Sequence, residues 1–358
     1  MARVTTDDRR PMTLVDVTAI VLWLGVTTYA VFGGADFGAG FWDLVSGRGD
    51  AGDRSRGLIA AAIGPVWEAN HTWLIFDLVI LWTAFPVAFA AIMSSLFVPL
   101  SLAAVGIVLR GAAFAFRPVV GTSRGRAITT GIFAASSVLT PFFLGAAGGG
   151  IASGRVSLDP GGGNLFGSWL NPTSILVGVM AVAACAYLAA VFLVADARRL
   201  GQADLAALFL RRARAAAVVT GGLAVVGILV LAVDAPVLAN ELTGRGWPLV
   251  VAGFLLGGAA LVAIGQRAPF GTRLLAVGAV VAVIWGWGVA QYPDILPRTL
   301  SLANAAAPTG SLGSLLVVFV AAAFLIAPSL ALLFWLTQRN RLGGHAPEAG
   351  ADPTARVD

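Results

Sequence analysis

Three acidic residues lie inside apolar stretches of the chain that are long enough to cross a membrane. Asp36 and Asp43 lie in the first stretch, and Glu68 lies in the second, within Gly64-Pro-Val-Trp-Glu-Ala-Asn-His-Thr-Trp-Leu74. A carboxylate at bilayer depth costs at least ~2.5 kcal/mol, so such a residue is expected to have a use or a partner. Buried carboxylates can accept and release protons near neutral pH. Asp43, Asp36 and Glu68, in that order, therefore predict a proton relay that steps inward from one membrane face.

Each acid also has a structural interpretation. Asp43, seven residues after Asp36 on the same helical face, could be a solvated charge at the membrane interface. Arg110 lies in a third apolar stretch, about 10 Å deeper than Arg117 along a helix, and a buried arginine needs an acidic partner. Either Asp36 or Glu68 could be that partner. The spacing alone leaves open whether these acids move protons or form ion pairs.

Other polar residues accompany Glu68, namely Trp67, Asn70 and His71. His71 follows Glu68 by three residues and shares its helical face. A single membrane histidine is more typical of a hydrogen-bonded core residue than of a metal ligand. Asp77 lies nine residues after Glu68, on the opposite face, and the sequence assigns it no role.

A later apolar stretch ends in aromatic residues, which are Trp285, Trp287 and Tyr292. This arrangement is typical of the aromatic belt at a membrane interface. The alternative is that these rings line a pocket for a lipid or a quinone.

The composition is that of an integral membrane protein. Of 358 residues, 58% are hydrophobic and 11% are charged, whereas soluble domains carry about 25% charged residues. All 23 basic residues are arginine, and no basic run with interleaved aromatics indicates nucleic acid binding. The only cysteine is Cys185, and His345 is the only histidine besides His71. The chain is therefore poorly equipped to bind haem or an iron–sulfur cluster alone.

The apolar stretches predict an all-α fold of about nine transmembrane helices, because each is near or above the ~20 residues of a span. They cover residues 13–42, 57–83, 87–115, 127–150, 172–195, 212–233, 247–265, 271–291 and 312–337. We expect one polytopic membrane domain over 1–342, with four-helix bundles at roughly 13–150 and 172–291 and an additional helix at 312–337. The polar tail, residues 343–358, is expected to be disordered and cytoplasmic.

The arginines predict the orientation of these helices. With nine spans, sixteen arginines lie in loops and ends on one side and six lie on the other. The positive-inside rule places the richer side in the cytoplasm, so the N-terminus is outside and the C-terminus is cytoplasmic. Asp43 then lies near the cytoplasmic end of the first helix, and Asp36 lies about two turns deeper.

Taken together, several motifs give the chain a resemblance to a known family, subunit II of the cytochrome bd-type quinol oxidases. The matching segments are Gly33-Gly-Ala-Asp-Phe-Gly-Ala-Gly40, Gly64-Pro-Val-Trp-Glu-Ala-Asn-His-Thr-Trp-Leu74, Leu109-Arg-Gly-Ala-Ala-Phe-Ala-Phe-Arg117, Asn171-Pro172, Gly286-Trp-Gly-Val-Ala-Gln-Tyr-Pro293 and Leu300-Ser-Leu-Ala-Asn-Ala305. They follow the family's order from the first helix to the start of the ninth.

The resemblance implies a subunit of a terminal oxidase complex in the bacterial plasma (inner) membrane. Such a complex oxidises quinol and reduces O2 to water in aerobic respiration. Haem b and haem d would be bound mainly by the partner, a haem-bearing subunit I that forms a heterodimer with this chain. A small third subunit, membrane lipid and a bound quinone are further expected components.

The resemblance also assigns roles to residues. It implies that this subunit stabilises the haems of subunit I and supplies a proton path from the cytoplasm through Asp36 and Glu68. Trp67 lies beside Glu68, and Arg110 is a polar partner. Two residues depart from the family pattern. Ala115 replaces a usual acid, which puts the entry of the path in doubt, and Gly150 replaces a usual asparagine.

Two other classes of function remain open on the sequence. One is a standalone secondary transporter coupled to protons through Asp36 and Glu68, since polar residues at mid-depth in broken helices suit transporters. The other is a purely structural assembly subunit, in which neutral replacements of the buried acids would be tolerated. A transporter purifies alone and colourless, whereas an oxidase subunit purifies with a haem-bearing chain.

Overall fold

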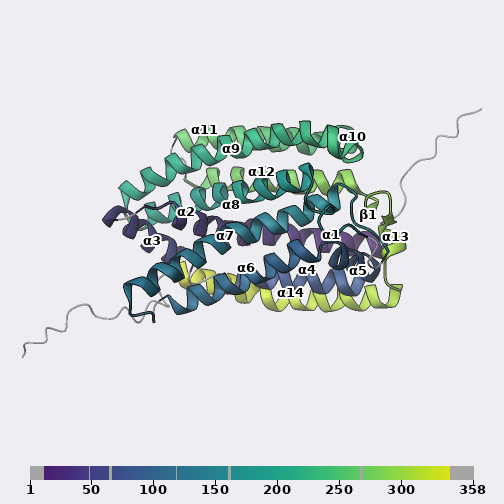
Figure 1. Ribbon diagram of the computed structural model, residues 1–358, viewed down its shortest axis with the longest axis horizontal. Helices are drawn as coiled ribbons and strands as arrows, with labels where there is room; N and C mark the ends of the chain where they lie inside the picture. The colour runs from purple at the N-terminus through teal and green to yellow at the C-terminus, as the bar shows by residue number, and fades with distance from the viewer. Residues whose placement is uncertain are drawn as a thin grey trace, which may run out of the picture. The chain divides into compact units, whose positions relative to one another are not determined.

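The computed structural model describes residues 12–47, 49–63, 67–117, 119–159, 163–266 and 269–338, and these are largely helical (Figure 1). The elements are α1 (Leu14–Thr28), the π-helical segment η1 (Tyr29–Gly33), α2 (Gly34–Leu44), α3 (Asp50–Ile63), α4 (Trp67–Ala84), α5 (Pro86–Ser95), α6 (Phe97–Phe116), α7 (Ser123–Ala152), α8 (Pro172–Arg199), α9 (Ala203–Asp234), α10 (Pro236–Gly244), α11 (Trp247–Gln266), α12 (Pro269–Gln291), β1 (Asp294–Leu296), β2 (Leu300–Ser301), α13 (Leu302–Ala305) and α14 (Thr309–Gln338). The chain separates into two compact units, Met1–Leu312 and Gly313–Asp358. The features described below lie in the first unit.

The described part of the chain contains eight helices that are long and apolar enough to span a membrane, or nine if α4 and α5 together form one span. This agrees with the predicted all-α membrane fold of about nine spans. The grouping into two four-helix bundles stays a prediction, and the predicted disordered tail lies outside the described residues.

The boundaries predicted for the second and third spans, 57–83 and 87–115, were wrong. The second stretch is divided between α3 and α4, and α4 meets α5 at a bend of 119°. Pro86 begins α5 and has no N–H to continue α4, and Phe85 has a non-helical backbone (φ −133°, ψ 60°). A second break at Leu96 separates α5 from α6. The run from 87 to 115 is therefore two helices.

The other differences lie at helix ends and in short elements. The sixth predicted span begins at Ala203 instead of residue 212, because arginine side chains near a membrane surface can extend to water and allow the helix to continue. Hydropathy gave no signal for α10 or α13. It also gave none for the antiparallel hairpin of β1 and β2.

The core of the first unit is built around α8. Residues 185–191 of α8 are all buried, as expected for a helix that is enclosed on every side. The long helices α6, α7, α8 and α9 each pack against the next along the chain, and α2 packs against both α7 and α8 (Figure 1). The position of α2 is important because it carries Asp36 and Asp43.

Small residues allow α2 to approach its neighbours closely. A Cβ added at Gly38 would overlap the backbone of Cys185 and Ala186 on α8, and one added at Gly40 would overlap the side chain of Ser137 on α7. Close contact through glycine is how helices associate in membranes, where the hydrophobic effect does not drive helices together. The glycines around Asp36 therefore hold it deep inside the helix bundle.

We expect the substitution Gly38→Ala to lower the thermal unfolding midpoint of the purified protein. The new methyl group meets α8 backbone, which cannot rotate away, so the cost should lie near the upper end of the 1–3 kcal/mol range typical of overpacking. The matched control is Gly57→Ala, because Gly57 is exposed on α3 with no atom within 4 Å of an added Cβ. That control should be neutral or slightly stabilising. Equal midpoints for the two variants would contradict the close packing of α2 on α8.

Candidate functional site

A buried ion pair joins α2 to α6. Arg110 Nη1 donates to Asp36 Oδ2 at 2.9 Å, and Arg110 Nη2 donates to Asp36 Oδ1 at 2.7 Å. Both side chains are only 2% exposed. This two-point geometry is the strong form of an arginine–carboxylate contact. Of the two acids that the sequence left open as partners for Arg110, the structure pairs it with Asp36.

The remaining contacts of Arg110 tie a third helix to the pair. Its Nε donates to Ser137 Oγ on α7 at 2.9 Å, and its Nη2 also donates to the Asp36 carbonyl oxygen at 3.2 Å. The guanidinium lies 5.0 Å from the centre of the Phe37 ring and 4.9 Å from that of Phe133. All three guanidinium nitrogens are therefore engaged, and the aromatic rings enclose the charge in a dry environment.

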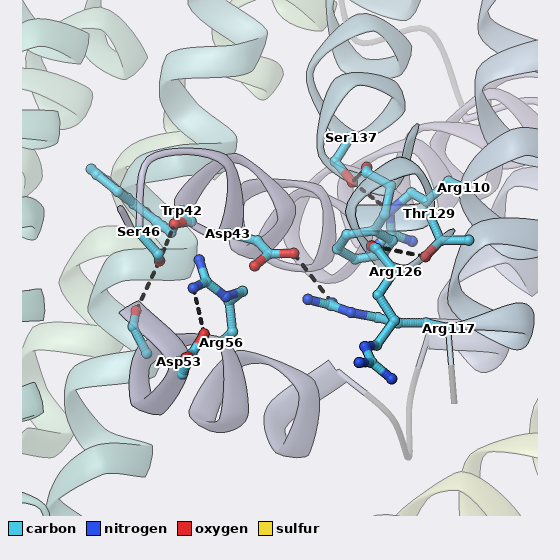
Figure 2. Close-up of polar contacts among 12 residues, drawn as sticks. Trp42, Asp43, Ser46, Asp53, Arg56, Arg110, Arg117, Arg126, Thr129 and Ser137 are labelled. Carbon is cyan, nitrogen blue, oxygen red and sulfur yellow. Dashed lines mark hydrogen bonds and ion pairs between the residues drawn. The ribbon is translucent and has the colours of Figure 1, made fainter. Parts of the chain in front are cut away.

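A second ion pair joins α2 to the end of α6, seven residues further along each chain segment. Figure 2 shows Asp43 and Arg117 joined by a contact between Asp43 Oδ2 and Arg117 Nη1, at 3.2 Å. Asp43 is 2% exposed, so the interpretation as a solvated interface charge was wrong. Its other oxygen, Oδ1, is buried without a hydrogen-bond partner among the described residues. Arg117 thus has an acidic partner on α2, even though Ala115 leaves none nearby on α6.

The π-helical segment η1 directly precedes α2 and ends three residues before Asp36. π-helical turns are rare and occur frequently at functional sites. Asn70 of α4 is 5% exposed, and its Nδ2 donates to the carbonyl oxygen of Phe32 within this segment at 3.3 Å. The Asn70 side chain therefore links α4 to η1, the π-helical segment that leads into the helix carrying Asp36.

His71 packs among aromatic rings. Its ring lies edge-on to Tyr29, with centroids 6.2 Å apart, and to Phe37, with centroids 5.9 Å apart. Phe37 in turn lies beneath the Arg110 guanidinium. In the described part of the chain, no group of three His, Cys, Asp or Glu residues could hold a metal ion. His71 is half-buried, and the Phe37 ring lies between it and the Arg110 guanidinium.

Two residues predicted for the site cannot be placed with the others. The side chains of Trp67 and Glu68 lie outside the described residues, although their backbone belongs to α4. The helix carries Glu68 three residues before His71 on the same face. The role of Glu68 as a proton carrier stays a prediction.

The aromatic end of α12 packs on α1, a contact that the sequence did not indicate. Trp285 Nε1 donates to Thr27 Oγ1 at 3.1 Å, and Trp287 lies edge-on to Trp23 with ring centroids 5.1 Å apart. A cavity of about 190 Å³ lies at the end of α12 and is lined by both polar and apolar residues. It is lined by Val237, Leu238, Glu241, Arg245, Ala290, Gln291, Tyr292, Pro293, Asp294, Pro297 and Arg298. Of the three aromatic residues singled out in the sequence, only Tyr292 lines it.

Comparison with known proteins gives one family. The family model for cytochrome bd terminal oxidase subunit II matches residues 14–337. Cytochrome bd-I ubiquinol oxidase subunit 2 of Escherichia coli (strain K12) is 31% identical over 178 residues, which cover 47% of this chain and 46% of that protein. Cytochrome bd ubiquinol oxidase subunit 2 of Bacillus subtilis (strain 168) is 30% identical over 112 residues, which cover 31% of this chain and 32% of that protein. The matched stretch therefore spans less than half of either relative.

A solved structure extends the similarity of fold over most of the chain. The structure of bd oxidase from Geobacillus thermodenitrificans matches with a TM-score of 0.73 and 24% identity, covering 92% of this chain and 100% of that one. At this identity the match shows a shared fold. Because the family model covers nearly all of the described residues, the chain belongs to the family of cytochrome bd terminal oxidase subunit II.

Proposed function

We propose that this chain is the subunit II of a terminal oxidase complex that oxidises quinol and reduces O2 to water in a bacterial inner membrane. The observation that carries the proposal is the family match over residues 14–337. The fold supports it, because the spans and their arrangement resemble those of a bd oxidase chain. A haem-bearing subunit I would be the obligatory partner.

Among the described residues, the histidine and the cysteine do not fit a haem site within this chain. A haem iron needs axial ligands such as histidine or cysteine. His71 packs edge-on against two aromatic rings, and Cys185 is buried in the core helix α8. We therefore assign haem b and haem d to the partner subunit and derive no step through them. A quinone, membrane lipid and a small third subunit remain proposed components of the complex.

The chemical contribution of this chain is proposed to be a proton path from the cytoplasm. The arginine distribution puts the Asp43–Arg117 pair at the cytoplasmic end, with the Asp36–Arg110 pair about 10 Å deeper. Arg110 holds both oxygens of Asp36, so Asp36 can take part in the path only when this contact opens. We assign the transfer of the proton to Glu68, and we propose that Trp67, Asn70 and His71 form its surroundings.

An affinity purification of this chain from its native membrane tests the proposal. We expect a second large subunit to purify with it, and the reduced-minus-oxidised visible spectrum to show haem b and haem d bands. Mass spectrometry of the same preparation would detect a small third subunit and any bound quinone. A colourless protein that purifies alone would overturn the proposal and favour the standalone proton-coupled secondary transporter.

A further inference from the structure

The polar core contains one acid that neither ion pair uses. Asp77 of α4 is 8% exposed, and its Oδ1 is fully buried without a hydrogen-bond partner among the described residues. No ion pair joins Asp77 to any arginine of the described chain. Asp77 follows Asn70 by seven residues and thus lies on the same face of α4, which packs against α1 and η1.

The fold makes room for this carboxylate. Gly25 of α1 lies directly opposite, and a Cβ added there would overlap Asp77 Oδ1 and crowd the ring of Phe76. Any other residue at position 25 would displace the acid from this position. The Asp77 carboxylate therefore occupies space that is open only because Gly25 has no side chain.

The Tyr29 hydroxyl of η1 is a second buried polar group of this region, since η1 packs against α4 and leads into α2, which carries Asp36. It is buried and has no hydrogen-bond partner among the described residues. It interacts electrostatically with Arg110, with Asp36 and with Asp77. Tyr29 can both donate and accept a hydrogen bond, which suits it to pass a proton between two acids.

These groups lie at different depths that together cover most of the thickness of the membrane. Gly25 marks the level of Asp77, because the two are in contact. Along the continuous run of α1, η1 and α2, Asp36 follows Gly25 by eleven residues and Asp43 follows it by eighteen. At 1.5 Å per residue, Asp77 lies roughly 25 Å from the level of Asp43, close to the ~30 Å thickness of the hydrocarbon core. Asp36 and Tyr29 occupy intermediate levels. Asp77 therefore lies in the half of the membrane remote from Asp43.

We propose that Asp77 is a further proton-binding site in the half of the membrane remote from Asp43, and that the Tyr29 hydroxyl links it to Asp36. The proposal rests on the proton path of the proposed function and extends it. An ionised carboxylate without a cation is costly at this depth, so the neutral acid is the resting form. A proton arriving from hydronium forms the O–H bond on Asp77 and leaves water behind.

The first test asks whether Asp77 holds a proton. In the assembled complex, with aspartate labelled by 13C, the infrared spectrum at neutral pH should contain a protonated-carboxyl C=O band. Asp77→Asn should remove from that band the intensity of one carboxyl group. The matched control is Asp53→Asn, because the Asp53 side chain is 72% exposed and paired with Arg56, so it contributes nothing to the band. An unchanged band in Asp77→Asn would overturn the proposal.

The second test asks whether the proton takes part in turnover. Asp77→Asn and Tyr29→Phe should each slow oxygen consumption several-fold while the haem spectrum stays unchanged. Asparagine has the shape and zero charge of a protonated aspartate, so a complex that fails to assemble with Asp77→Asn would contradict the proposal. If Asp77→Asn removes the infrared band but leaves oxygen consumption unchanged, then Asp77 binds a proton but is not part of the proton path, and the proposal is overturned. Failure of the proposed function is distinguished separately, by a colourless chain that purifies without a partner.

Discussion

Replacing Arg110 by methionine is expected to remove most of the folded subunit from the membrane. The substitution keeps an apolar stem but leaves the Asp36 carboxylate without its cation at a site where the side chain is 2% exposed. Removing one partner of a buried pair typically costs ~3–5 kcal/mol, a large share of the 5–15 kcal/mol that stabilises an ordinary domain. The measurement is the amount of assembled complex in detergent extracts, together with its thermal unfolding midpoint.

Two further variants separate an unpaired charge from lost packing. The double variant Asp36→Asn with Arg110→Met carries no buried charge, so it should recover part of the lost stability. Arg117→Met is the matched control, because Arg117 is 23% exposed and makes a single contact of 3.2 Å to Asp43. Arg117→Met should lower the amount of assembled complex and its thermal unfolding midpoint less than Arg110→Met does. A double variant as unstable as Arg110→Met alone would show that the cost does not come from the unpaired carboxylate.

The two ion pairs were within reach of the sequence. Asp36 and Asp43 are seven residues apart, and so are Arg110 and Arg117. Equal intervals on two helices that run in the same direction place each acid opposite one arginine, which is the arrangement that α2 and α6 show. The spacing shows that each pair shares a helical face, but it does not show which helices are neighbours. The sequence alone is therefore also compatible with a solvated charge at Asp43, whereas the structure buries it against Arg117.

Other features gave no signal in hydropathy or spacing. The π-helical segment Tyr29–Gly33 has the same apolar composition as the α-helices that flank it, so only its hydrogen bonds reveal it. The bend at Phe85 was marked by Pro86, but a proline in an apolar run is compatible with either a kink or a break. The space that Gly25 leaves for Asp77 depends on how α1 packs against α4, and no local pattern encodes that contact.

Replacing Glu68 by glutamine is expected to slow oxygen consumption sharply while the complex stays assembled. Glutamine keeps the size of the side chain but cannot carry a proton. Positioned proton donors and acceptors typically contribute 10²–10⁴-fold to a rate, so we expect a loss of about 100-fold or more. Oxygen uptake would be measured with an electrode on the purified complex, with haem content from the visible spectrum as the check on assembly.

The control for this experiment is Glu241→Gln, since Glu241 is an exposed glutamate on α10 that pairs with Arg245 four residues later. It should leave oxygen uptake unchanged. Unchanged uptake in Glu68→Gln as well would show that Glu68 does not carry the transferred proton, and it would favour a purely structural role for the subunit. If Glu68→Gln is slow but Asp36→Asn is not, then Asp36 acts with Arg110 as a fixed charge pair, and the proton passes through Glu68 without passing through Asp36.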